Sequence, residues 1–198
     1  MRFSADAICF NSVIRVMADN VADTQLNAYF LAEQFALKTG RPLFITGKAG
    51  TGKTTFLKKL REQSPKNLAV VAPTGIAAIN AGGMTIHSLF QLPVRTLVPT
   101  PQSYRKLFAE QRMTQRKRNM LYHLEMLVID EISMVRADVL DAVDAVLRRY
   151  KYRQNLPFGG VQVVMLRSIR AAVRTRLMLL TLRHFSPTCS LCCIRRFT

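Results

Sequence analysis

Acidic residues are missing from the last quarter of this 198-residue chain, because no Asp or Glu follows Asp144. Lysine is missing from much of the same region: from Arg167 to the end there are seven Arg and no Lys. A site that needs carboxylates must therefore lie upstream. The tail also supplies seven of the 17 net positive charges, so part of the basic character belongs to the tail and not to a binding surface.

Cysteines and long apolar runs are also scarce. Cys9 stands alone near the start, and the other three cysteines fall in the last ten residues. The first 17 residues lack the clean apolar core of a secretory signal, and the apolar run 177–182 is too short to span a bilayer. We expect no membrane partner and a reducing compartment: cytoplasmic, with nucleoid association in a bacterium, or the nucleus or mitochondrion of a eukaryote.

What remains is a globular, basic chain. Hydrophobic residues make up 49% of the sequence, which excludes a disordered chain. The length suffices for one domain with a core, or one domain and a tail. A net charge of +17 favours a polyanionic partner.

The strongest pattern is the stretch 47–54, GKAGTGKT, which fits the phosphate-binding P-loop G-x-x-x-x-G-K-[ST]. An apolar run precedes it and a helical pattern follows. Glycines let the backbone approach a polyphosphate, and the helix N-terminus adds N–H groups. Lys53 can reach the β- and γ-phosphates, and the Thr54 hydroxyl can bind Mg²⁺. The alternative is a Gly-rich turn without a ligand. The residues predicted to bind ATP are Gly47, Lys48, Ala49, Gly50, Thr51, Gly52, Lys53, Thr54 and Thr55.

An acid pair follows a second apolar run about 80 residues later. The run 126–129 leads directly into Asp130 and Glu131, and a strand that ends in two carboxylates is the partner that a P-loop needs. We predict that Asp130 holds Mg²⁺, directly or through water, and that Glu131 polarises the attacking water as general base. Lys53, Asp130 and Glu131 are thus the predicted catalytic residues.

Weaker signals surround these motifs. Gln25 or Gln34, in the predicted helix 23–38, is a candidate for the adenine edge of ATP, although a surface position is as good an interpretation. His87 has no partner at metal-ligand spacing, so a zinc role is not expected. The basic segment 95–119 is either a solvated helix with a connector or a contact to polynucleotide phosphates.

Strand and helix patterns alternate through Met165. They predict an α/β fold: a parallel sheet flanked by helices, with its ligand at the carboxyl ends of the strands. In the amphipathic helix 137–150, we expect Asp138, Asp141 and Asp144 to face water.

Five stretches together resemble the Pif-type (petite integration frequency) superfamily 1B DNA helicases. They are FITGKAGTGKTT at 44–55, APTGIAA at 72–78, TIHS at 85–88, IDEISM at 129–134 and PFGGVQ at 157–162. The resemblance implies a RecA-like P-loop domain and an ATP-dependent motor that moves 5′ to 3′ on single-stranded DNA or DNA junctions. It implies that Thr74, Gly75 and His87 contact the DNA, and that the role is genome maintenance: repair, recombination and telomere maintenance.

The resemblance stops near Met165. The family continues with Gly-Asp-x-x-Gln, whereas this chain continues Leu166-Arg167-Ser168. We expect an N-terminal extension at 1–22, a RecA-like ATPase domain at 23–165 and an aberrant tail at 166–198, produced by truncation or a change of reading frame. Without a second motor domain to supply an arginine finger, worth about 10³–10⁵ in rate, we expect weak or no ATPase activity and no unwinding.

Other functions stay open. The runner-up is a non-catalytic basic module that retains the P-loop fold and binds nucleic acid or a partner. A AAA-type ATPase is a third possibility, against which the TIHS stretch argues. The tail also holds one candidate zinc set of weak ligand spacing, for which accidental cysteines are the better interpretation: His184, Cys189, Cys192 and Cys193. The sequence leaves the oligomeric state unknown.

Overall fold

The computed structural model describes residues 15–17, 22–48 and 50–169, and the structural statements below concern these residues. Within them six strands form one sheet: β1 (Arg15–Met17), β2 (Leu43–Lys48), β3 (Leu68–Ala72), β4 (Met84–Thr85), β5 (Met126–Ile129) and β6 (Gln162–Ile169). The helices of the same ranges are α1 (Ala22–Lys38), α2 (Lys53–Gln63), α3 (Gly75–Asn80), α4 (Ile86–Phe90), α5 (Pro101–Glu110), α6 (Gln115–His123) and α7 (Ala137–Tyr150). Two 3-10 turns are η1 (Ile132–Met134) and η2 (Pro157–Gly160). The four residues weighed as zinc ligands lie outside the described residues.

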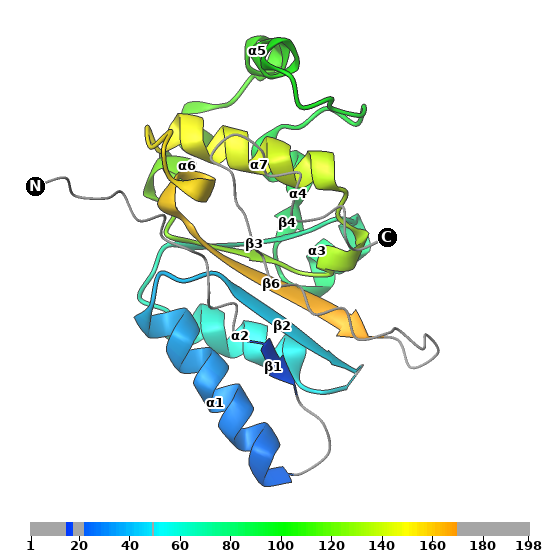
Figure 1. Ribbon diagram of the computed structural model, residues 1–198, viewed down its shortest axis with the longest axis vertical. Coiled ribbons are helices and arrows are strands. Elements are labelled where there is room, and N and C mark those ends of the chain that lie inside the picture. Colours follow the sequence, from blue (N-terminus) through cyan, green and yellow to red (C-terminus); the bar gives the residue numbers. More distant parts are fainter. Residues whose placement is uncertain (1–14, 18–21, 49, 170–198) are drawn as a thin grey trace, which may run out of the picture.

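All strands of the sheet are parallel, and their order is β1-β2-β6-β5-β3-β4. Helices α1 and α2 cover one face, and α4, α6 and α7 cover the other (Figure 1). This confirms the predicted α/β fold. Strand β6 lies between β2, which leads into the P-loop, and β5, which leads into the acid pair. Because parallel strands point the same way, the segments after these three strands meet at the carboxyl ends of the strands, which form one edge of the sheet.

Alternation along the central strands divides the core into two clusters. On β6, Val164 and Leu166 pack with residues of α1 and α2, whereas Val163 packs with residues of α4, α6 and α7. Strand β5 is buried along its whole length. A strand covered on both faces needs apolar side chains on both, which explains the continuous apolar runs 68–72 and 126–129.

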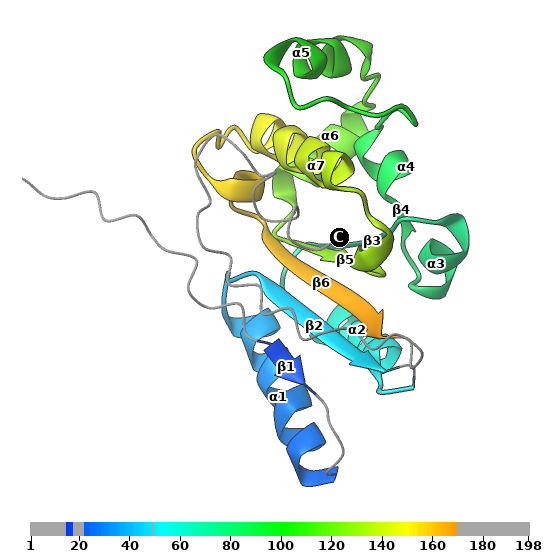
Figure 2. The ribbon, with the colours of Figure 1, turned by 45° about the vertical axis from the view of Figure 1, so that its right-hand side comes forward.

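The structure also contains elements that the sequence did not predict. Strands β1 and β4 have three and two residues and are the outermost strands on the two sides of the sheet. Strand β6 continues to Ile169, beyond the domain boundary expected at residue 165. The basic segment 95–119 contains α5 and the start of α6, and α5 stands away from the sheet (Figure 2). None of the helices in the described ranges combines the length and apolar character that crossing a bilayer requires.

The expectation that the aspartates of α7 face water is wrong. Asp141 and Asp144 are 5% and 7% exposed, and the Asp138 side chain is 15% exposed. Asp144 accepts hydrogen bonds from the Arg148 side chain and from the Phe158 N–H of η2. Asp138 accepts a hydrogen bond from a backbone N–H of the segment that precedes α5. Loops that pack onto α7 bring N–H donors to Asp138 and Asp144. Helix periodicity alone could not reveal those loops.

Gln162 joins the beginning of β6 to the end of α1. Its side chain is buried, and its amide nitrogen donates to the Arg41 carbonyl at 2.8 Å. Its amide oxygen accepts from the Lys66 ammonium at 2.7 Å, and that ammonium also donates to the carbonyls of Ala36 and Thr39. Burial lowers the pKa of Lys66, against a weaker opposing effect of a nearby carboxylate. A partly buried ammonium of this kind depends on its acceptors.

We predict that Gln162→Leu lowers the free energy of unfolding by about 2–4 kcal/mol, because Lys66 and the Arg41 carbonyl lose a buried partner. Urea denaturation followed by circular dichroism measures the loss. The matched control is Gln154→Leu, at an exposed position, for which we expect a change within about 0.5 kcal/mol. Equal effects of the two substitutions would contradict the role given to Gln162.

Candidate functional site

The turn after β2 has the backbone of a phosphate-binding loop. Gly50 and Gly52 have φ values of +83° and +84°, a left-handed conformation that glycine adopts without steric cost. A Cβ on Gly47 would lie 2.5 Å from the Thr51 side-chain oxygen, so a larger residue at that position would have to displace the Thr51 side chain. Of the predicted loop residues, Ala49 lies outside the described residues.

Lys53 is the first residue of α2, and its ammonium group folds back over the turn. It donates to the carbonyl oxygens of Gly47 at 2.8 Å and Lys48 at 2.7 Å. Helix α2 begins without a side-chain cap, so its first N–H groups are available to an anion. Thr54 and Thr55 follow in this first turn and are exposed.

The acid pair begins where β5 ends. The Asp130 N–H donates to the Val71 carbonyl of β3 at 2.9 Å, and the Glu131 N–H donates to Asp130 Oδ1 at 2.9 Å. Glu131 has φ 48° and ψ 48°, a left-handed conformation that costs a residue with a Cβ roughly 1–2 kcal/mol. Its carboxylate reaches β6, where Oε1 accepts a hydrogen bond from the Ser168 hydroxyl at 2.8 Å.

Lys53 and the two carboxylates lie within range of one another's charge. Burial lowers the pKa of Lys53, and the charges of Glu131 and Asp130 partly reverse this effect. Burial also raises the pKa of Asp130, opposed by the hydrogen bond from the Glu131 N–H and by the Lys53 charge. In both groups desolvation outweighs the attraction between them. The site thus holds charges that the protein compensates only in part.

The residues expected to contact DNA lie farther along the same edge of the sheet. The Thr74 hydroxyl accepts a hydrogen bond from the Ala77 N–H and caps α3, in which Gly75 is the first residue. The Thr85 hydroxyl caps α4 in the same way, and His87 lies in the first turn of that helix. Helices α3 and α4 follow β3 and β4, next to each other (Figure 2). Among the described residues no cluster of His, Cys, Asp and Glu forms a metal site around His87.

The candidate adenine-binding residues are less informative. Gln25 lies in α1, but its side chain is outside what the structure describes. Gln34 lies in the same helix and is partly buried.

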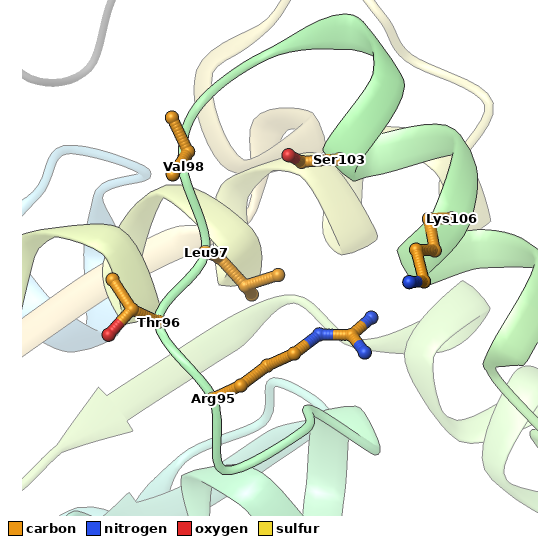
Figure 3. Close-up of a pocket in the computed structure, with 6 residues that line it drawn as sticks. All are labelled: Arg95, Thr96, Leu97, Val98, Ser103 and Lys106. Atoms are coloured by element: carbon orange, nitrogen blue, oxygen red, sulfur yellow. The ribbon is translucent and has the colours of Figure 1, made fainter.

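A cavity away from this edge lies between the segment 95–98 and α5 (Figure 3). Two cations line it, Arg95 and Lys106, and both form ion pairs with Glu110. These pairs leave little positive charge for the phosphates of a nucleotide. The P-loop edge is therefore the better candidate for the nucleotide site.

Comparisons with known proteins agree with this geometry. A family model described as PIF1-like helicase matches residues 20–170. The ATP-dependent DNA helicase PIF1 of Candida albicans is 39% identical over 144 residues, which are 67% of this chain and 15% of that protein. The structure of Bacteroides Pif1 bound to single-stranded DNA is similar with a TM-score of 0.61 and 46% identity, over 76% of this chain and 32% of that one. Bacteroides Pif1 in complex with ADP-AlF4 gives a TM-score of 0.63 and 42% identity, over 79% and 35%. The chain thus spans about a third of these solved chains and 15% of the Candida protein.

We predict that Asp130→Asn raises the thermal unfolding midpoint at pH 7, by less than about 4 °C. The folded-state pKa of Asp130 lies above its ordinary value of 3.8, so the unfolded chain releases this proton first as the pH rises. The native state therefore loses stability through that interval, and Asn removes the loss. The gain should shrink as the pH is lowered toward 4. Differential scanning fluorimetry across this pH range measures it.

The matched control is Asp138→Asn, for which we expect the opposite sign. Burial alone would raise the pKa of Asp138, but hydrogen bonds from the Leu97 N–H, Arg136 and the Val139 N–H together lower it. The stability that this carboxylate contributes is present above its ordinary pKa and is lost as the pH falls through the lowered value. Asp138→Asn should therefore lower the midpoint at pH 7. A lower midpoint for Asp130→Asn as well would show that desolvation does not dominate at the acid pair.

Proposed function

Because the chain belongs to the PIF1-like helicase family, we propose that it carries the nucleotide-binding half of an ATP-dependent DNA helicase motor. The observation that carries the proposal is the arrangement at the carboxyl ends of the strands: the P-loop after β2, over which the Lys53 ammonium is folded, and the acid pair after β5 flank the same strand, β6. For this chain the proposal is binding of ATP and its weak hydrolysis. For the complete motor it is movement 5′ to 3′ along single-stranded DNA and unwinding, in the service of genome maintenance.

In this proposal the turn 47–55 surrounds the phosphates of ATP. Its N–H groups and the start of α2 bind the phosphate oxygens. The Lys53 ammonium exchanges its bonds to the carbonyls of Gly47 and Lys48 for bonds to the β- and γ-phosphates. That exchange restores full charge compensation to Lys53.

The acid pair and Thr54 offer oxygen donors that fit Mg²⁺, and the pair also offers a general base for the attacking water. The Thr54 hydroxyl and the Asp130 carboxylate offer the hard oxygen donors that Mg²⁺ prefers, and they would hold the ion directly or through water. Mg²⁺ bound there would neutralise charge on the phosphates. Glu131 accepts the proton of the water that attacks the γ-phosphate.

Single-stranded DNA would run along the same edge of the sheet, over α3 and α4. Thr74 and Gly75 would contact its phosphates, and His87 would lie beside a base. Both helices begin at the carboxyl ends of strands of the sheet that holds the P-loop, so DNA and ATP would bind close to each other. The structure of the related Bacteroides protein with single-stranded DNA supports this partner.

A second candidate is a basic module that binds nucleic acid without an ATPase cycle. Exposed cations on and beside α5 and α6 favour it, namely Arg105, Arg112 and Arg116. Binding by such a surface would depend strongly on salt and not on nucleotide.

We predict that Lys53→Ala weakens binding of a fluorescent ATP analogue by about tenfold or more, whereas Glu131→Gln preserves binding and lowers kcat by about 10²–10³. Fluorescence titration and phosphate release measure the two effects. Lys58→Ala is the matched control, because Lys58 is an exposed lysine of the same helix. Unchanged binding in Lys53→Ala, with DNA affinity indifferent to ATP, would favour the basic module.

We also predict that His87→Ala weakens binding of a thymidine oligonucleotide by about fivefold, the loss of roughly 1 kcal/mol of contact with a base. His123→Ala is the matched control. His123 ends α6 and is exposed just before β5 begins, so it lies at the opposite edge of the sheet. Fluorescence anisotropy at a fixed salt concentration measures both. Equal losses of affinity in the two variants would show that the single-stranded DNA does not run past His87.

A further inference from the structure

Ser168 contacts the acid pair from a stretch in which the sequence showed no functional residue. Its hydroxyl donates a hydrogen bond of 2.8 Å to Glu131 Oε1. Ser168 is partly buried in β6, and 37 positions separate it from Glu131 in the chain.

The topology explains why Ser168 can make this contact. Strand β6 pairs with β5 on one side and with β2 on the other. In the second pairing Ser168 stands opposite Gly47, the first glycine of the P-loop. Ser168 also continues the row of Val164 and Leu166, because alternate residues of a strand share a face. That face is covered by α2, the helix that follows the P-loop. Ser168 therefore lies between the phosphate-binding turn and the acid pair.

The geometry points to Ser168 as a positioning residue that holds the Glu131 carboxylate for proton abstraction, an inference that rests on the proposed ATPase function. A glutamate in a left-handed turn has a side chain with several rotamers open to it, and one bound carboxylate oxygen restricts them. The hydroxyl occupies Oε1 and leaves the other oxygen to accept a proton from water. In this role Ser168 acts only through Glu131.

The experiment compares Ser168→Ala with Ser168→Thr, which retains the hydroxyl. We expect kcat for ATP to fall about three- to tenfold in Ser168→Ala, in line with the net contribution of one typical hydrogen bond, with KM within twofold of the wild type. Ser168→Thr should restore kcat. The control is Ser64→Ala at the far end of α2, where the hydroxyl also takes part in one local hydrogen bond.

A second readout needs no turnover. Protein labelled with carbon-13 in its glutamate carboxyl groups gives a Glu131 signal, assigned by its loss in Glu131→Gln. In the nucleotide-free protein this signal should move in Ser168→Ala, remain in place in Ser64→Ala and return toward its original position in Ser168→Thr.

The two readouts separate the two claims. Absence of hydrolysis in the wild type would overturn the proposed function, and the carbon-13 signal would then decide alone whether Ser168 holds Glu131. An unmoved signal in Ser168→Ala overturns the inference. So does a kcat equal to that of Ser64→Ala, or a loss confined to KM.

Discussion

The parallel hydrogen bonding of β2, β6 and β5 is the constraint on which the whole site depends. In register, Met165 of β6 stands opposite Phe44 of β2 on one side and Ile129 of β5 on the other. Strand β5 ends at Ile129, opposite Met165, whereas β2 ends at Lys48, opposite Ile169, so the register fixes where the chain leaves each strand. A slip along either ladder would shift the P-loop against the acid pair and reverse the face of every side chain in the strand. Burial of both faces prevents this slip, since a shift by one residue would carry Arg167 into the core position that Leu166 fills.

These strands hold charged groups whose burial is unfavourable, because other groups of the protein compensate their charges only in part. Burial lowers the pKa of Lys53 and raises the pKa of Asp130, which favours the neutral form of each group although their charges attract each other. Glu131 adds the cost of a left-handed backbone. Strain and uncompensated charge often gather at functional sites, where a ligand relieves them. A polyphosphate with Mg²⁺ would supply the missing charges on both sides. By contrast, Asp144 and Asp138 are also shielded from water, but N–H and guanidinium donors satisfy them fully.

The sequence predicted the features that local patterns encode. The central strands β2, β3 and β5 are short apolar runs between polar or glycine-containing stretches, and α7 has a clear apolar face, so all four lie where the patterns indicated. The edge strands β1 and β4 were missed because two or three residues carry no periodicity. Asp144 and Ser168 were misjudged for another reason. Their environments come from Phe158 and Glu131, distant in the chain, and no local pattern records a partner brought in by the fold. The alternation of Val164, Leu166 and Ser168 was the one available signal that β6 continues.

The stretch PFGGVQ shows how a family pattern can arise from folding instead of chemistry. Its residues lie at the start of β6, away from the phosphate turn, and three of them fix that start. The Phe158 N–H binds Asp144 of α7, and Gly159 has a φ of +62° with no room for a Cβ beside the Leu147 carbonyl. Gln162 then ties the first residue of β6 to the end of α1 through Lys66. Because β6 separates the P-loop from the acid pair, an error in its start would move both ends of the site. Anchoring β6 on both sides of the sheet, at α7 and at α1, is therefore what sets the distance between Lys53 and the carboxylates.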